Sequence, residues 1–188
     1  MGFIFYEKSA RYAQQWPIQN LDFVPPSIKK IGVFVNESVE NILDIVRQYH
    51  LDGVQLHGNE NPEMCGYLKA KKMLCIKSFG IAHPDDFAAA NGYEPHTDYF
   101  LFDTKTPAHG GSGQKFDWGI LQSYRGTKPF FLSGGIAPDD AADILQIQHP
   151  CLFGVDINSG FETAPAIKNA AQIRQFISTL YPDNPNLK

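Results

Sequence analysis

Short, nearly uninterrupted runs of apolar residues recur along the chain. Seven such runs lie at residues 3–6, 31–35, 54–56, 73–76, 99–102, 130–132 and 152–155. Runs that are apolar throughout, rather than alternating with polar residues, are typical of strands buried on both faces, and therefore of a parallel sheet. Their spacing of roughly 20–30 residues is the size of a strand plus the helix that follows it. The pattern predicts an α/β fold with seven strand-helix units.

Helical periodicity appears between the apolar runs. One apolar stripe consists of Val39, Ile42, Ile45, Val46 and Tyr49, and another of Ile173, Phe176, Ile177 and Leu180. Proline after Asn61 and after Ala137 predicts helices that begin at Pro62 and Pro138. No change in composition marks a domain boundary. We therefore expect a single domain over residues 1–181, followed by a frayed tail over residues 182–188.

Two architectures fit seven units. A doubly wound open sheet has helices on both faces and binds ligands at a switch point. A (β/α)8 barrel closes on itself and typically has ~250 residues, with a lower limit near ~200, whereas this chain has 188. The first apolar run follows Met1 and Gly2 directly, without a turn or a helix cap. This beginning suggests a barrel whose opening strand-helix unit is missing.

Composition and charge narrow the class of protein. With 43% hydrophobic and 13% aromatic residues, the chain can bury a core, which excludes a disordered protein. A net charge of −4 argues against a nucleic-acid partner, and no apolar run approaches the ~20 residues of a membrane span. Cys65, Cys75 and Cys151 show no CxxC spacing. We expect no disulfide framework, no zinc site, no secretory signal and no membrane partner, and hence a cytoplasmic protein.

Polar residues follow every apolar run, at the end of the strand where ligands bind in parallel α/β folds. Three of these segments are rich in glycine, at residues 110–113, 133–135 and 158–160. Glycine lets backbone N–H groups approach an anion, and the last two loops of a barrel often bind phosphate. The alternative for any one of these glycines is an ordinary turn. We predict a phosphate site formed by Gly111, Ser112, Gly113, Gly134, Gly135, Ser159 and Gly160.

Four other side chains at strand ends are candidates for chemistry. Asp103 follows an apolar run directly, where loss of hydration suits a general acid near neutral pH; the alternative is a loop or capping aspartate. Asp156 has the same position after the last run and the same alternative. His57 is a candidate proton carrier or a hydrogen-bonded histidine at a strand end. Arg11 either clamps a carboxylate through its fork or is an exposed cation.

These segments together resemble the phosphoribosylanthranilate isomerase family, the (β/α)8-barrel enzymes of tryptophan biosynthesis. The matching segments run in family order from residue 2 to about residue 170. They are residues 2–6 and 9–12, residues 32–36, Val-Gln-Leu-His-Gly at 54–58, Asp-Thr-Lys at 103–105, Gly-Gly-Ser-Gly at 110–113 with Phe-Asp-Trp at 116–118, Ser-Gly-Gly at 133–135, and residues 155–162. The resemblance implies a (β/α)8-type barrel of which this chain holds seven units.

The resemblance also implies an activity, namely the Amadori rearrangement of N-(5-phosphoribosyl)anthranilate to a 1-deoxyribulose phosphate by acid–base catalysis, without metal or cofactor. It implies that Asp103 is the general acid, that Arg11 binds the anthranilate end, that His57 and Asp156 contact the substrate, and that the glycine loops hold its phosphate. In the family the general base is the cysteine of a Lys-x-Cys-Gly motif that precedes the first matching segment. This motif does not occur in the chain, and none of its three cysteines matches the position.

Other hypotheses compete with an active isomerase. A chain without the base would be an inactive or binding-only homologue. A third hypothesis is a different phosphate-handling barrel, an epimerase or a lyase. Epimerases of this architecture need several metal ligands, which His57 alone does not supply. A lyase of the aldolase type needs a lysine for a Schiff base, and Lys77 is the one candidate. Seven strands without an eighth would leave two sheet edges open, so we expect poor stability or a homo-oligomer formed through these edges.

Overall fold

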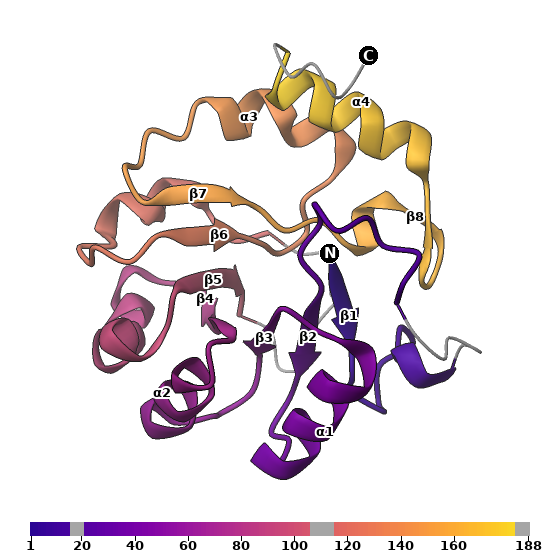
Figure 1. Ribbon diagram of the computed structural model, residues 1–188. Coiled ribbons are helices and arrows are strands. Elements are labelled where there is room, and N and C mark those ends of the chain that lie inside the picture. Colours follow the sequence, from indigo (N-terminus) through magenta and orange to yellow (C-terminus); the bar gives the residue numbers. More distant parts are fainter. Residues whose placement is uncertain (16–20, 106–114, 183–188) are drawn as a thin grey trace.

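The computed structural model describes residues 1–15, 21–105 and 115–182. Seven parallel strands form one sheet, and they pair in the order in which they occur along the chain. They are β1 (Gly2–Ile4), β2 (Ile31–Phe34), β3 (Gly53–Leu56), β4 (Leu74–Ile81), β5 (Tyr99–Thr104), β6 (Phe130–Leu132) and β7 (Leu152–Val155). The sheet curls so that β1 and β7 approach the same region, as in a partial barrel (Figure 1). The predicted parallel α/β fold with seven strands is confirmed.

The α-helices lie on the outside of the curled sheet (Figure 1). They are α1 (Val39–Tyr49), α2 (Pro62–Ala70), α3 (Ala141–Leu145) and α4 (Ala170–Leu180). The Ser38 hydroxyl caps the first by accepting from the N–H of Asn41, and Asn61 caps the second by accepting from the N–H of Met64. Helix α1 ends where His50 takes a left-handed conformation, with φ 50°. These local signals explain where both helices begin and where α1 ends, and the start at Pro62 agrees with the prediction.

The connections after β1, β4, β5, β6 and β7 contain 3₁₀ helices. These are η1 (Ala13–Gln15), η2 (Pro84–His96), η3 (Trp118–Ser123), η4 (Pro138–Asp140) and η5 (Ser159–Phe161). The predicted helix start at Pro138 is confirmed, with η4 leading directly into α3. A two-stranded antiparallel hairpin of β8 (Glu162–Ala164) and β9 (Ile167–Lys168) was not expected from the sequence. This hairpin follows β7 and becomes part of the site described below.

Two apolar clusters fill the space between the sheet and the helices. One lies between β1–β3 and helices α1 and α2, around Phe34, Ile42 and Leu68. The other packs β4–β7 against α3, α4 and the 3₁₀ segments, with several aromatic contacts around Phe102. A third, smaller cluster consists of Ile31, Ile76 and Leu101. These three residues line a cavity inside the curl, so the interior of the sheet forms the floor of that cavity.

Strand β4 differs from its prediction. The apolar run at residues 73–76 predicts that this strand ends before Lys77 and Ser78. Instead β4 continues to Ile81, and the Lys77 side chain is only 2% exposed. The expectation that Lys77 and Ser78 stand at a strand end is therefore wrong. Lys77 does not line the interior cavity, which removes it as a Schiff-base lysine for ligands bound there.

The sheet is open between its first and last strands. In the described part of the chain, β1 pairs with β2 and β7 pairs with β6, but β1 and β7 do not pair with each other. A single parallel bridge between Ile4 and Tyr12 covers part of the outer edge of β1. Phe153 on β7 is 58% exposed although it packs on the rings of Tyr99 and Phe131. Apolar side chains are thus exposed at this opening.

Candidate active site

A cavity of about 920 Å³ lies inside the curled sheet. Its polar lining comes from residues at or just beyond the carboxyl ends of β1, β3, β5, β6 and β7, where parallel α/β folds bind ligands. Residues predicted for the site that line this cavity are Arg11, His57, Asp103, Gly134, Gly135, Asp156 and Ser159. The structure therefore brings together side chains that are far apart in sequence.

His57 and Asp103 contact each other at this end of the sheet. His57 Nε2 lies 3.3 Å from Asp103 Oδ2, and both side chains are less than one-fifth exposed. The other carboxylate oxygen, Oδ1, accepts a hydrogen bond of 2.8 Å from the N–H of Thr104. His57 follows β3 while Asp103 is on β5, so the contact spans the intervening β4. On β4, Gly80 lies in register with Asp103.

Asp156 lies after β7 and is held by β6. The Ser133 hydroxyl donates to Asp156 Oδ2 at 3.1 Å. Burial raises the pKa of Asp156, and the nearby Asp103 carboxylate raises it further, while the hydrogen bond from Ser133 opposes the shift. At Asp156 the cavity therefore contains a carboxyl group whose neutral form is favoured more than that of an exposed aspartate. Such a group can donate as well as accept hydrogen bonds.

The glycine segments after β6 and β7 meet at one side of the cavity. Gly134 and Gly135 both have positive φ, 92° and 65°, which favours glycine. A Cβ on Gly160 would lie 2.2 Å from the carbonyl oxygen of Ile136, so the two loops touch through backbone. The N–H groups of Gly134, Gly135, Ser159 and Gly160 donate to no other described residue. Backbone donors grouped in this way suit an anion.

Gly111, Ser112 and Gly113, which the sequence predicts to bind phosphate, lie outside the described residues.

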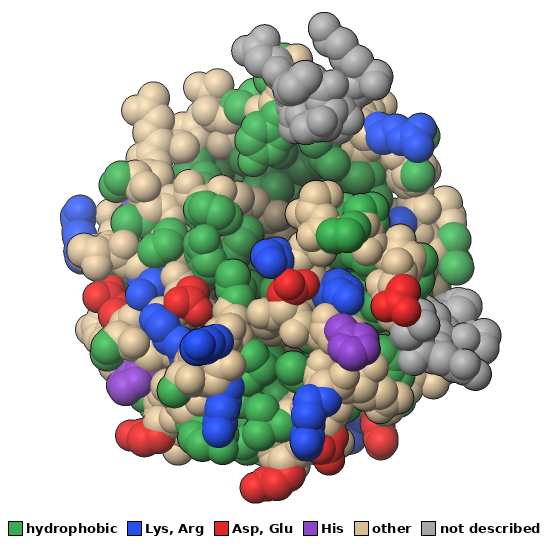
Figure 2. Space-filling view, in the orientation of Figure 1, with side chains coloured by type: hydrophobic (Ala, Val, Ile, Leu, Met, Phe, Trp, Pro, Cys, Tyr) green, Lys and Arg blue, Asp and Glu red, His purple; other side chains and the backbone are tan. Residues whose placement is uncertain are grey.

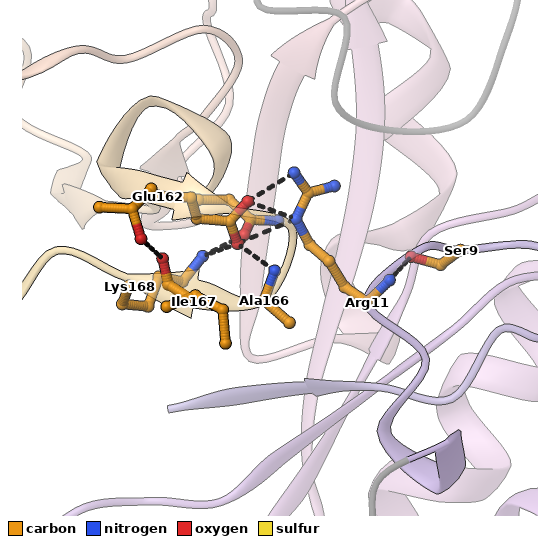
Figure 3. A network of polar contacts seen from close by, with 8 residues as sticks. Ser9, Arg11, Glu162, Ala166, Ile167 and Lys168 are labelled. Carbon is orange, nitrogen blue, oxygen red and sulfur yellow. Dashed lines mark hydrogen bonds and ion pairs between the residues drawn. The ribbon is translucent and has the colours of Figure 1, made fainter.

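Arg11 follows β1 and makes a fork with Glu162 of the β8–β9 hairpin (Figure 3). Its Nε lies 3.0 and 2.9 Å from the two carboxylate oxygens, and its Nη2 lies 2.6 Å from one of them. Lys168 Nζ is 2.6 Å from the same carboxylate. Burial alone would raise the pKa of Glu162, but the hydrogen bonds and charges of Arg11 and Lys168 lower it to about 2. This network joins the segments that follow the two edge strands.

A buried ion pair holds the turn that carries His57. Lys77 Nζ lies 3.3 Å from Glu60 Oε2 and donates to the carbonyls of Leu56 and Gly58, on either side of His57. Glu60 in turn accepts from the N–H groups of Gly58 and Asn36. Burial lowers the pKa of Lys77, whereas Glu60 opposes the shift. The sequence does not reveal this pair, because its members are separated along the chain and no local pattern links them.

Gly58 is required next to His57 for a packing reason. A Cβ at position 58 would lie 2.4 Å from Asn36 Oδ1, the atom that accepts a hydrogen bond from the N–H of Asn59. Asn36 itself has a positive φ of 53°. The glycine of the His-Gly motif therefore lets the turns after β2 and β3 pack together, and its role is structural.

The three cysteines lie away from the cavity. Cys65 of α2 and Cys75 of β4 are fully buried in the cluster outside the sheet, and Cys151 precedes β7. Hydrogen bonding with Cys65 and burial raise the pKa of Cys75. No cysteine thiol lines the cavity among the described residues. In the same part of the chain, no three His, Cys, Asp or Glu side chains are grouped so that they could hold a metal ion.

The molecular surface shows no patch of a single charge on the visible face. Basic and acidic side chains are interspersed there, with hydrophobic side chains between them (Figure 2). None of the helices in the described ranges is long and apolar enough to cross a membrane.

Comparison with known proteins gives consistent results. The profile of the family described as N-(5'phosphoribosyl)anthranilate (PRA) isomerase matches residues 1–179. An N-(5'-phosphoribosyl)anthranilate isomerase from Phocaeicola vulgatus is 49% identical over 180 residues, which cover 96% of this chain and 86% of the relative. Another from Parabacteroides distasonis is 46% identical, covering 96% of this chain and 82% of the relative.

Solved structures agree with the sequence relatives. The crystal structure of phosphoribosyl anthranilate isomerase from Thermotoga maritima superposes with a TM-score of 0.81 at 36% identity, covering 96% of this chain and 87% of that one. A phosphoribosyl anthranilate isomerase in complex with reduced 1-(o-carboxyphenylamino)-1-deoxyribulose 5-phosphate has a TM-score of 0.77 at 33% identity, with 96% and 86% covered. The similarity thus extends over nearly all of this chain.

Proposed function

This chain belongs to the N-(5'-phosphoribosyl)anthranilate isomerase family, and from that premise we propose which of its residues carry out the isomerase reaction of tryptophan biosynthesis. The substrate is a small phosphorylated molecule, and the solved relative with a phosphorylated ligand supports binding of this class. The observation that carries the proposal is the meeting of His57, Asp103, Asp156 and the two glycine loops around one cavity. The reaction converts an aminoaldose phosphate into an aminoketose.

Asp103 is the proposed general acid. It protonates the furanose ring oxygen, which opens the ring to a Schiff base between the sugar and the anthranilate nitrogen. Its position at the cavity, less than one-fifth exposed, limits competition from water. His57 contacts the carboxyl group and keeps one oxygen directed, while the backbone N–H of Thr104 holds the other. The acid therefore has a fixed orientation, which general acid catalysis requires.

The phosphate and the anthranilate are proposed to bind at different sides of the cavity. The donor groups of Gly134, Gly135, Ser159 and Gly160 suit the phosphate, and the same role is proposed for the segment that contains Gly111, Ser112 and Gly113. Asp156 suits the ribose hydroxyls. Arg11 suits the anthranilate carboxylate, because Glu162 occupies its Nε and Nη2 side and leaves Nη1 without a bond to a described residue.

Removal of the C2 proton gives an enolamine that tautomerises to the ketone, and this step needs a general base. The family's cysteine base is known here only from the resemblance, and none of the described thiols lines the cavity. An inactive or binding-only chain is the second candidate function. Both relatives cited above are named isomerases, so their names do not favour the binding-only function. Turnover and binding must therefore be measured separately.

Calorimetric titration with reduced 1-(o-carboxyphenylamino)-1-deoxyribulose 5-phosphate tests binding, and fluorescence of the substrate tests turnover. We expect the unchanged chain to bind this probe. Arg11→Met should weaken binding about tenfold or more, since an ionic hydrogen bond contributes ~1.5–3 kcal/mol. Asp103→Asn should retain binding and lose turnover by ~10²–10⁴-fold. Lys29→Met, a change at an exposed pair before β2, is the matched control.

The results separate the hypotheses. Binding with turnover that depends on Asp103 supports the isomerase. Binding without turnover in the unchanged chain supports the binding-only function. Full turnover in Asp103→Asn would remove Asp103 from its role, and absence of binding would contradict both functions.

The open edges of β1 and β7 are proposed to pair with a second copy of the chain. Unpaired N–H and C=O groups on a sheet edge recruit other strands, and the exposed ring of Phe153 adds apolar area at this opening. Light scattering after size-exclusion chromatography should show a dimer or larger species, and Phe153→Lys should reduce it. A thermally robust monomer at all concentrations would contradict this proposal.

We also propose a cytoplasmic location and a single domain over residues 1–181. The three free cysteines support the location.

A further inference from the structure

One polar side chain inside the curl has no role in the mechanism above. Gln55 is on β3, two residues before His57, so both side chains point to the same face of the sheet. It is 8% exposed and lines the cavity. Its partners in register on the neighbouring strands are Val33 and Ile76, both apolar. A buried amide in such surroundings needs a hydrogen-bond partner.

That partner is the ring of His57. Gln55 Nε2 lies 3.1 Å from His57 Nδ1. A neutral imidazole has one donor nitrogen and one acceptor nitrogen, and an amide nitrogen only donates. His57 Nδ1 must therefore accept, which places the ring proton on Nε2. That nitrogen lies 3.3 Å from Asp103 Oδ2, close enough for its N–H to interact with the carboxylate.

The opposite orientation of the amide fits less well. If Gln55 presented its oxygen, His57 Nδ1 would have to carry the proton, and Nε2 would present a lone pair to Asp103. Two acceptors would then face each other once Asp103 has given its proton to the sugar, which costs free energy in a partly buried site. For that ionised carboxylate, the arrangement is consistent only when the amide donates to the ring and the ring donates to Asp103.

We propose that Gln55 is a positioning residue that fixes the tautomer and orientation of His57, so that His57 Nε2–H holds the Asp103 carboxylate in place. The role in catalysis rests on the proposed function, in which Asp103 is the acid. The tautomer itself does not, because it follows from the contacts of the His57 ring with Gln55 and Asp103, whatever part Asp103 plays in the reaction. The two statements can therefore fail separately.

The test is ¹⁵N NMR of the ring nitrogens of the intact chain labelled in histidine, at about pH 8, above the ordinary titration range of imidazole. The spectrum contains an internal reference. His149 Nδ1 accepts from the N–H of Cys151 at 3.1 Å, a backbone donor that cannot reverse. His149 must therefore be protonated at Nε2, next to the carbonyl of Tyr124. The His57 signals are assigned from their loss in His57→Gln.

We expect His57 to show the same pattern as His149, with a non-protonated Nδ1 and a protonated Nε2. Gln55→Leu removes the donor, so the two ring signals should shift towards each other as both tautomers become populated. Gln55→Glu replaces the donor with an acceptor, so Nδ1 should move to its protonated position. Unchanged His149 signals in each variant show that the fold is intact.

Asp103→Asn distinguishes the two neighbours of the ring. If Gln55 sets the tautomer, His57 keeps its pattern in this variant. A His57 pattern that is unchanged in Gln55→Leu and lost in Asp103→Asn would show that Asp103 sets the tautomer, and would overturn the proposal. A protonated Nδ1 in the unchanged chain would also overturn it. Turnover that survives Asp103→Asn would refute the proposed acid and leave the tautomer result standing.

Discussion

Replacing Lys77 with methionine should destabilise the fold strongly. Methionine is close to lysine in length and is apolar, so Lys77→Met keeps much of the packing in the buried cluster and removes only the charge and its hydrogen bonds. Lys77 and Glu60 are 2% and 1% exposed, so water cannot replace the lost partner. Glu60 would remain as a buried carboxylate without its cation.

The expected loss follows from the contacts of the pair. Breaking a buried ion pair by removing one partner costs ~3–5 kcal/mol. Glu60 keeps its hydrogen bonds from the N–H groups of Asn36 and Gly58, which places the loss near the lower value. The carbonyls of Leu56 and Gly58 also lose a donor. A loss of ~3 kcal/mol corresponds to a fall in Tm of roughly 6–12 °C for a domain of this size.

Urea unfolding followed by circular dichroism measures the loss. Lys29→Met is the matched control, because the Lys29–Asp52 pair is 66% and 33% exposed and should contribute less than ~1 kcal/mol. The double variant Lys77→Met with Glu60→Gln should be more stable than Lys77→Met alone, since it removes the uncompensated carboxylate. Two results would refute the reasoning. One is an equal loss of unfolding free energy in Lys77→Met and Lys29→Met, and the other is a double variant less stable than either single variant of the pair.

Two further predictions concern carboxyl groups at the cavity. The pKa of Glu162 in the fold is about 2 and its ordinary value is 4.5, so its contribution to stability is complete above pH 4.5 and is lost as the pH falls towards 2. Glu162→Gln should cost ~1–2 kcal/mol of stability at pH 7. Between pH 4.5 and pH 2, its urea midpoint should fall less than that of the unchanged chain. Burial raises the pKa of Asp156, so its ionisation opposes folding. Asp156→Asn should therefore raise the Tm at pH 7, and this gain should disappear below the ordinary pKa of 3.8; a lower Tm at pH 7 would contradict the prediction. The same variant should weaken binding of the reduced product analogue.

The strands and their order could be predicted from the sequence because burial on both faces leaves a direct mark, a run without polar residues. The same mark failed at Lys77, where a charged residue continues the strand. Its burial depends on Glu60, which is distant in sequence, and no local pattern reports such a pair. The β8–β9 hairpin was missed for a related reason. Its strands are very short, and their contact with Arg11 comes from the other end of the chain.

Positions of the site residues followed from one rule, that ligands meet the carboxyl ends of parallel strands. The rule located His57, Asp103 and Asp156 at one cavity, but it could not supply their partners. Gln55 lies within an otherwise apolar run, which hides that its amide contacts the His57 ring. A polar residue two positions before a candidate catalytic residue shares its face of the strand, and this spacing was the available signal.

The two sides of the cavity are supported in different ways. His57, Asp103 and Ser133 stand on or just beyond strands that pair on both sides, so register fixes the distances between them. Asp156 follows the edge strand β7 and is held by the Ser133 hydroxyl. Arg11 follows an edge strand that pairs on one side with β2, and its guanidinium is held by the fork with Glu162. The proposed acid, Asp103, is thus positioned by the backbone of the sheet. Arg11, the proposed carboxylate-binding group, depends on side-chain contacts across the open side, and its position should respond most to whatever covers the edges of β1 and β7.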